Sequence, residues 1–509
     1  MVNTVCNGGI FMKRLISILL CVVMIISVLG CTKSNQAVSN DGASEEATST
    51  NIVEVIKKPE SINILWNTAI SLSTKEEKAD FAKALSDELG MDVKFTEYDR
   101  EVSADYYENY YSVLGTAFAN NEAPDVVIID SKHYAEYAAA GYLWDMTNAF
   151  EKSELKASGR ITAVGEKVIA NNYIDGKLYG MQYQRGNGCI TYVRTKWLEE
   201  CGLSAPTNFE EYYNMLVTFK NKYNVAPLTA PGFISLDAPY TNYLPEFYQD
   251  AYPAFYKNAE GKWVDGFSEE AMEQAIARIK KGYEAGLFDV DTGTNTTVDC
   301  REGLINEEHG VFTYWAGTWS VRLSEKLIEG NVTDSRFTMI KAIEEVNGYV
   351  EKDGYVFAIS ANADNPEGIF EYFIEQIFDG DKVQTLWTYG KEGKQWSMAE
   401  GQFQYLKDSM GFLYDTILID DALSIVNFVN GTKAPIPQVE KDALKLLEDD
   451  ACYERDRLVG VEKEAEIMAY KATLIDLVVT GEMTYEKAIE DYTKTYGAYV
   501  KEVLEKANK

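Results

Sequence analysis

The chain has 509 residues and a formal net charge of −32, because 80 acidic side chains outnumber 48 basic ones. So acidic a surface repels phosphate backbones, which argues against nucleic acid as a partner. With two histidines, no zinc-like cysteine spacing, no apparent phosphate loop and no nucleophile elbow, the sequence predicts no metal and no cofactor. The length exceeds what one hydrophobic core usually holds, so at least two lobes are expected.

Residues 12–31 have the organisation of an export signal. Lys13 and Arg14 precede a short apolar run that ends in small residues. The run is shorter than the roughly 20 residues of a membrane-spanning helix. Its ending, Val28-Leu29-Gly30-Cys31, resembles the lipobox of bacterial lipoproteins, which implies that Cys31 is lipidated and tethers the mature protein to the extracellular face of the cell membrane. The alternative is an ordinary secreted protein whose signal contains a cysteine.

The next segments alternate between strand and helix patterns. Residues 32–60 are polar and of low complexity, which predicts a disordered linker. Apolar periodicity then predicts strands at 61–66, 92–96 and 124–130 and helices at 75–89 and 106–120. The β-branched run at 124–130 is typical of a strand covered on both faces. This order predicts an α/β fold around a parallel sheet.

A similar alternation follows later in the chain. A capping box at 206–210 opens a helix to Lys222, and Asn365-Pro366 caps a helix that runs to Phe378. Further strands are expected at 191–194, 310–314 and 354–359, with helices at 272–283 and 489–499. The sequence therefore predicts a second α/β lobe.

Two smaller patterns leave alternatives open. Cys189 and Cys201 either pair in an oxidising exterior or remain isolated thiols. Residues 289–295 place oxygen ligands at alternate positions, as a calcium loop does, but the distal glutamate of such a loop is missing. Calcium is therefore a minor alternative.

Several short motifs, in their order and spacing, resemble the extracellular solute-binding proteins of sugar-transporting ABC importers. They cover most of the chain from Ser61 onward. The segment at 389–393 and the long C-terminal part resemble the large lipoprotein subgroup of Gram-positive bacteria, whose members are assigned to complex oligosaccharides. The motifs lie at 175–181, 192–198, 201–207, 284–288, 310–319, 389–393 and 481–485.

The resemblance implies a two-lobe periplasmic-binding-protein-like fold of the maltose-binding type. It implies a monomer that is not an enzyme, captures an extracellular oligosaccharide between its lobes and delivers it to membrane permeases. The chain would cross between lobes near 183–188, 342–349 and 378–382. The expected domains are a signal peptide at 1–31, a linker at 32–60, an N-terminal lobe at 61–184 completed by 345–378, and a C-terminal lobe at 185–344 completed by 379–509.

Residues that follow strands are the first candidates for ligand contacts, because ligands of open α/β sheets bind beyond the carboxyl ends of the strands. Asp130 can accept two sugar hydroxyls or cap the next helix. Arg185, at the first crossing, can bind hydroxyls or a uronate carboxylate, or form a salt bridge between lobes. The same reasoning selects Trp66, Asn67, Ser131, Gln182 and Tyr183.

The 34 tyrosines and eight tryptophans supply flat faces suited to sugars. Trp319 is the strongest aromatic candidate, because the resemblance implies a tryptophan in the loop after a strand that stacks on a pyranose ring. Trp315 ends that strand and faces either the core or the site. The remaining candidates near loops, with interlobe packing as the alternative, are Tyr240, Trp387, Tyr389 and Trp396, and we select Tyr240, Tyr389 and Trp396.

Three other functions remain open at this point. An extracellular glycoside hydrolase would need two carboxylates facing each other across a cleft. A peptide receptor of the same architecture would anchor the ligand termini with an acidic and a basic residue. A purely structural surface lipoprotein would show no change with any ligand.

Overall fold

The structure is a computed structural model. It describes residues 55–66, 74–96, 106–159, 169–170, 172–182, 188–235, 240–329, 337–346, 354–379, 381–400, 402–406, 438–449, 458 and 461–509. The export signal with Cys31, and most of the linker, lie outside the described residues. No helix in the described ranges has both the length and the apolar character needed to cross a bilayer.

The first lobe is built on a five-stranded sheet of order β2-β1-β3-β13-β6. Its strands β1 (Ser61–Leu65), β2 (Asp92–Thr96) and β3 (Val126–Ile129) are parallel, as the sequence predicts. The later strand β13 (Val356–Ile359) lies antiparallel between β3 and β6 (Gly180–Gln182). A segment distant in sequence therefore completes this lobe.

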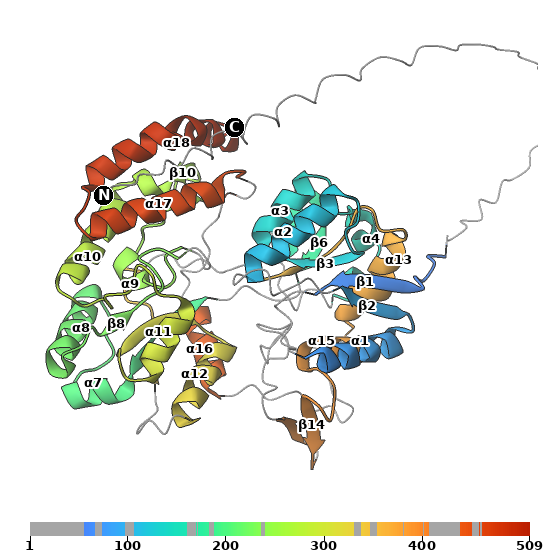
Figure 1. Ribbon diagram of the computed structural model, residues 1–509, viewed down its shortest axis with the longest axis horizontal. Helices are drawn as coiled ribbons and strands as arrows, with labels where there is room; N and C mark the ends of the chain where they lie inside the picture. The colour runs from blue at the N-terminus through green and yellow to red at the C-terminus, as the bar shows by residue number, and fades with distance from the viewer. Residues whose placement is uncertain are drawn as a thin grey trace, which may run out of the picture. The chain divides into compact units, whose positions relative to one another are not determined.

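Both faces of the first sheet are covered, because its central strand buries alternate side chains in opposite cores. Val126 and Ile128 of β3 belong to a core with α1 (Lys75–Leu89) and α15 (Lys382–Tyr389). Val127 and Ile129 belong to a core with α2 (Tyr106–Ala119) and α3 (Ser131–Ala139). All four residues of β3 are buried, which confirms the prediction made from the β-branched run. In Figure 1, α2 and α3 lie on one side of this sheet and α1 and α15 on the other.

Smaller elements complete the first lobe. They are α4 (Thr147–Glu151), α5 (Glu154–Ala157), the hairpin β4 (Tyr173–Ile174) with β5 (Lys177–Leu178), and the hairpin β14 (Trp396–Ala399) with β15 (Gln402–Tyr405). The helix expected at 366–378 is α13 (Pro366–Ile369), a π-helical segment η3 (Phe370–Ile374) and α14 (Glu375–Ile377). The Asn365 side chain caps its start, accepting a hydrogen bond from the Gly368 amide.

The second lobe is built on a four-stranded sheet of order β12-β7-β11-β8. Strand β7 (Cys189–Arg194) is antiparallel to β11 (Val311–Trp315) and β12 (Phe337–Ile340), while β8 (Leu228–Thr229) is parallel to β11. Along the chain, β6 of the first lobe is followed by β7 of the second lobe. Residues 183–187, which connect them, lie outside the described ranges.

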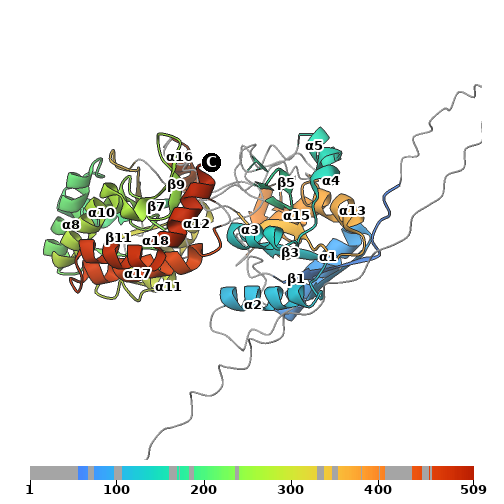
Figure 2. The same cartoon turned by 90° about the horizontal axis from the view of Figure 1, so that it is seen from above.

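Helices cover both sides of the second sheet. The larger core includes α7 (Thr195–Cys201), α8 (Phe209–Tyr223), α9 (Pro245–Tyr248), α10 (Glu270–Glu284), α17 (Glu464–Val479) and α18 (Tyr485–Ala507). The smaller core includes α11 (Thr297–Ile305), α12 (Thr318–Glu329) and α16 (Gln438–Asp449). The hairpin β9 (Phe255–Lys257) with β10 (Trp263–Asp265) and the short helix η2 (Gly266–Ser268) pack beside α18. Helices α17 and α18 run side by side (Figure 2).

One expected domain boundary needs correction. The sequence analysis assigns everything from 379 onward to the C-terminal lobe. However, α15 packs against α1, and its Trp387 is buried in the first lobe's core, 5.1 Å from the ring of Phe81. Lys391 also pairs with Asp80 of α1. The first lobe therefore extends beyond α15, and α16 is the next described element that belongs to the second lobe.

Candidate functional site

Strand register gathers several predicted residues at one edge of the first sheet. Val356 of β13 is level with Ile129 of β3 and with Gln182 of β6. Asp130 follows Ile129 directly, so the carboxyl end of β3 and the end of β6 share this edge. Both Asp130 and Gln182 are buried. Tyr183, Arg185 and Asn67 lie outside the described residues, and of Ser131 the structure describes only its backbone, at the start of α3.

Asp130 caps helix α3. Its Oδ1 accepts a hydrogen bond of 2.9 Å from the backbone amide of His133, and the His133 Nδ1 lies 3.0 Å from the same oxygen. The ring of His133 stacks on Tyr111 with 3.4 Å between centroids, and the Tyr111 hydroxyl accepts the amide hydrogen of Asp130. The structure thus shows the helix-capping alternative for Asp130, and a ligand hydroxyl would have to share a carboxylate that already has partners.

Trp66 lies in the core of the first lobe and not on its surface. Its side chain is 1% exposed, meets Phe95 edge to face at 4.9 Å and lies under the Lys78 ammonium at 4.8 Å. Its indole nitrogen finds no acceptor among the described residues. A ring buried in this way offers no face to a ligand, so its position differs from the one expected of a stacking residue.

The carboxyl end of β11 lies at the edge of the second sheet where the chain enters this lobe. Trp315 is level with Cys189, the first residue of β7, and the Ala316 amide donates to the Gly188 carbonyl at 3.0 Å. Trp315 itself is 8% exposed and belongs to the smaller core, which is the first of the two alternatives considered for it. The Tyr192 hydroxyl donates to its carbonyl.

Trp319 lies in the first turn of helix α12 and not in a loop. Gly317, with a φ of +65°, makes the turn that brings the chain from β11 into this helix. The ring of Trp319 is half-buried and meets Tyr314 edge to face at 5.1 Å. Two guanidinium groups lie over it, with the Cζ atoms of Arg301 and Arg322 at 4.6 Å and 5.2 Å from its centroid.

The remaining aromatic candidates have structural contacts. The Tyr240 hydroxyl donates to Glu464 Oε1 at 3.2 Å, at the start of α17. Tyr389 is buried at the end of α15, in the first lobe. The Trp396 indole donates to the Gly390 carbonyl at 2.9 Å and thereby holds the β14 hairpin against the end of α15. Tyr240 therefore belongs to the second lobe, whereas Tyr389 and Trp396 belong to the first.

Tyr314 is absent from the residues selected by sequence, and the sequence leaves open whether Arg185, Arg301 or Arg322 makes the site selective for an acidic sugar. The Arg301 Nη1 donates to the Tyr314 hydroxyl at 2.7 Å. Arg301 belongs to α11 and Trp319 to α12, and only the packing of both helices on β11 brings them together. Tyr314 and Trp315 are both buried in the smaller core, so no local pattern of β11 points to Tyr314 as a site residue.

The calcium-like loop and the cysteines have other roles. The Asp289 carboxylate accepts from Asn295 at 2.7 Å and pairs with His309 at 3.2 Å, and the bond to His309 holds the Asp289 pKa well below its usual range. Among the described residues no cluster of three or more His, Cys, Asp or Glu side chains could hold a metal. Cys189, Cys201 and Cys300 are free thiols.

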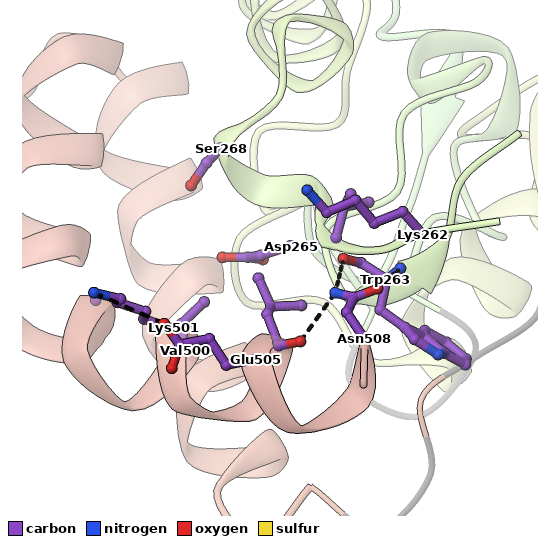
Figure 3. Close-up of a pocket in the computed structure, with 11 residues that line it drawn as sticks. Lys262, Trp263, Asp265, Ser268, Val500, Lys501, Glu505 and Asn508 are labelled. Atoms are coloured by element: carbon purple, nitrogen blue, oxygen red, sulfur yellow. Dashed lines mark hydrogen bonds and ion pairs between the residues drawn. The ribbon is translucent and has the colours of Figure 1, made fainter. Parts of the chain in front are cut away.

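A groove of about 530 Å³ lies between β10 and the end of α18 (Figure 3). Its polar groups are already engaged. The Asn508 side chain bonds both the amide and the carbonyl of Trp263, and Asp265 pairs with Lys471 and Tyr492. The groove holds none of the predicted ligand contacts and offers few free hydrogen-bonding groups.

Comparison with known proteins gives a consistent result. A family model described as bacterial extracellular solute-binding protein matches residues 73–374. Lipoprotein LipO of Bacillus subtilis is 21% identical over 366 residues, which are 68% of this chain and 70% of LipO. The N-glycan transport solute-binding protein NgtS of Streptococcus pneumoniae superposes with a TM-score of 0.61 at 18% identity, covering 89% of this chain and 98% of NgtS.

An HMO-binding solute-binding protein of an ABC transporter from Bifidobacterium longum infantis has a TM-score of 0.63 at 14% identity, covering 88% of this chain and 97% of the other. At these identities the likenesses show the fold. They confirm the predicted two-lobe α/β architecture of solute-binding proteins.

Proposed function

Since the chain belongs to the family of bacterial extracellular solute-binding proteins, by the match over residues 73–374, we propose that it binds an extracellular oligosaccharide and presents it to the permease subunits of an ABC importer. The solved structures that share its fold include an HMO-binding solute-binding protein and an N-glycan transport solute-binding protein. A two-lobe receptor serves this function because a ligand that contacts both lobes favours the closed form by its differential affinity.

The observation that carries the proposal is the cluster around Trp319. A half-buried tryptophan, a tyrosine and two guanidinium groups converge at the carboxyl end of β11, at the edge where the chain enters the lobe. Aromatic rings with hydrogen-bond donors beside them suit ligands that have apolar C–H faces and many hydroxyls. Trp319 contacts the sugar in this proposal, and the edge of the first sheet with Gln182 and Asp130 supplies contacts from the other lobe.

The protein binds and does not turn over its ligand in this proposal. It remains at the extracellular face of the membrane through lipidated Cys31, joined by a polar linker. It acts as a monomer, since each chain carries both lobes.

Thermal-shift screening against plant and host oligosaccharides tests the proposal directly. A ligand that binds only the folded state raises its stability by RT ln(1 + [L]/Kd), which is about 2.7 kcal/mol at a hundredfold excess over Kd. We expect a clear rise in melting temperature with an oligosaccharide and none with peptides. Chromatography of the incubated sugar should return it intact. Cleavage would assign the protein to the glycoside hydrolases, and stabilisation by peptides alone would make it a peptide receptor.

A further inference from the structure

We propose, resting on the function proposed above, that the oligosaccharide carries a carboxylate and that Arg301 and Arg322 recognise it at Trp319. The ligand class is thus a uronic-acid-containing saccharide and not a neutral one. The inference concerns the same site and specifies that the ligand bound there is negatively charged.

Arg301 is held in place by two rings and one hydrogen bond. Its guanidinium carbon lies 4.6 Å from the Trp319 centroid and 5.3 Å from that of Tyr314, and its Nη1 donates to the Tyr314 hydroxyl at 2.7 Å. Contacts of this kind orient a guanidinium while leaving most of its five N–H donors for other acceptors. A site oriented in advance loses less entropy when its ligand binds.

The charge of Arg301 is not neutralised within the protein. In the part of the chain that the structure describes, Arg301 makes no ion pair, although acidic side chains outnumber basic ones by 80 to 48. Two other arginines of this lobe, Arg194 and Arg278, differ. Arg194 donates to the carbonyls of Ile305 and His309, and Arg278 to those of Phe247 and Tyr248. Those guanidinium groups hold the fold, whereas that of Arg301 is half-buried with donors to spare.

Arg322 brings a second positive charge to the same ring. It lies three residues after Trp319 on α12, and its guanidinium carbon is 5.2 Å from the Trp319 centroid. The amino-terminal end of α12 adds further positive potential at this point.

A carboxylate suits this arrangement better than a neutral hydroxyl does. A guanidinium presents its donors as a planar fork that matches the two oxygens of a carboxylate. The two guanidinium groups also lie within 5.2 Å of the Trp319 centroid, so a saccharide that contacts this ring meets both donors. A uronic acid residue would therefore place its carboxylate against the arginines and its ring carbons against the remaining aromatic surface.

Calorimetric titration of the purified protein with a panel of uronate oligosaccharides, each compared with its own carboxyl-reduced form, tests this inference. We expect the acidic form to bind at least about tenfold more tightly than the reduced form. Added salt should weaken binding of the acidic form and leave that of the reduced form nearly unchanged. Arg301→Gln should bring the ratio of the two affinities close to one, with an unchanged melting temperature.

Lys257→Gln is the matched control. It also removes a cation over a tryptophan, since Lys257 Nζ lies 5.2 Å from the Trp263 centroid, but at the far hairpin β9–β10. The ratio of the affinities for the acidic and the reduced oligosaccharide should be unchanged in this variant. If Arg301→Gln does not fold, Arg322→Gln and the salt dependence of the unmodified protein decide the question. Equal binding of acidic and reduced forms would overturn the inference and leave the proposed function intact, whereas binding of neither, with no neutral sugar bound, would overturn both.

Discussion

The side-chain carboxyl group of Glu246, in α9, is buried inside the second lobe. It is 1% exposed, and one of its oxygens accepts a hydrogen bond of 2.5 Å from the Thr191 hydroxyl. The other oxygen finds no partner in the part of the chain that the structure describes. Burial raises the pKa of Glu246 to about 7 from the ordinary 4.5, although the bond from Thr191 opposes the rise. The protonated form is thus the one that the fold prefers.

Glu246→Gln should change the pH dependence of stability. Because the folded-state pKa is raised, the native protein holds a proton that the unfolded chain releases between pH 4.5 and 7, and stability falls as pH rises through this window. Glutamine removes this loss. Relative to the unmodified protein, the variant should gain roughly 2–3 kcal/mol in unfolding free energy between pH 5 and pH 8. Urea titrations at both pH values measure it, and parallel pH profiles of the two proteins would contradict the account.

Trp319 and Trp387 make a matched pair for separating binding from stability. Trp319 is half-buried at the candidate site, whereas Trp387 is fully buried in the first lobe's core. Trp319→Ala should weaken oligosaccharide binding about tenfold or more, because an aromatic contact contributes on the order of 1–2 kcal/mol, and should leave the melting temperature nearly unchanged.

Trp387→Ala should have the opposite effect, costing about 3–5 kcal/mol of stability through the cavity it leaves. Calorimetric titration beside a melting curve compares the two. Normal affinity with a lowered melting temperature for Trp319→Ala would assign that side chain to the core.

At the scale of elements, a buried ion pair joins α17 to the hairpin β9–β10 and to α18. Lys471 is fully buried, and its Nζ donates to Asp265 Oδ1 at 2.7 Å and to the Pro253 carbonyl at 2.6 Å. The Tyr492 hydroxyl of α18 donates to the other oxygen of Asp265 at 2.7 Å. Burial lowers the pKa of Lys471, while the Asp265 charge opposes that shift. Three segments therefore depend on one ammonium group.

Lys471→Met should destabilise the protein by about 3–5 kcal/mol, because it leaves the Asp265 carboxylate buried without its counter-ion. Chemical denaturation gives the value. Lys487→Met is the control, since Lys487 makes only exposed ion pairs with Glu490 and Asp491 on α18 and its loss should barely move the midpoint. If both variants unfold at the same denaturant concentration, the buried pair does not hold these elements together.

The elements that could be predicted are those whose signal is local. The β-branched run of β3 and the apolar periodicity of α1 are local patterns, and the structure has both elements where these patterns predict them. A local pattern could not predict the lobe to which α15 belongs, because that assignment depends on the long-range contact of Trp387 with Phe81.

The candidate site shows the same limit. The sequence singles out Trp319 from its neighbours in the chain, but Arg301 reaches it only through the packing of α11 beside α12. The sequence analysis places Trp319 in a loop because the resemblance implies one there, whereas in the structure α12 begins at Thr318. Trp66 follows its strand as expected, yet its ring continues the alternation of Ile62 and Ile64 and therefore turns into the same core.

At the scale of the whole molecule, Cys31→Ala should release the protein from the membrane without changing its affinity for the ligand. The reason is that the polar linker separates the expected lipid anchor from both lobes. Fractionation of cells and calorimetric titration of the released protein check the two halves of this prediction. A variant that stays with the membrane fraction would show that Cys31 is not the anchor.

The two sheets are joined by chain segments that pass from β6 to β7, from β12 to β13 and from the β14–β15 hairpin to α16. Such connections allow lobes to move as rigid bodies, and a bound ligand then selects the closed form. The central claim is that an oligosaccharide does this. Small-angle scattering with and without a saturating oligosaccharide tests it most directly: the account predicts a smaller radius of gyration with the ligand, and an unchanged scattering curve would contradict it.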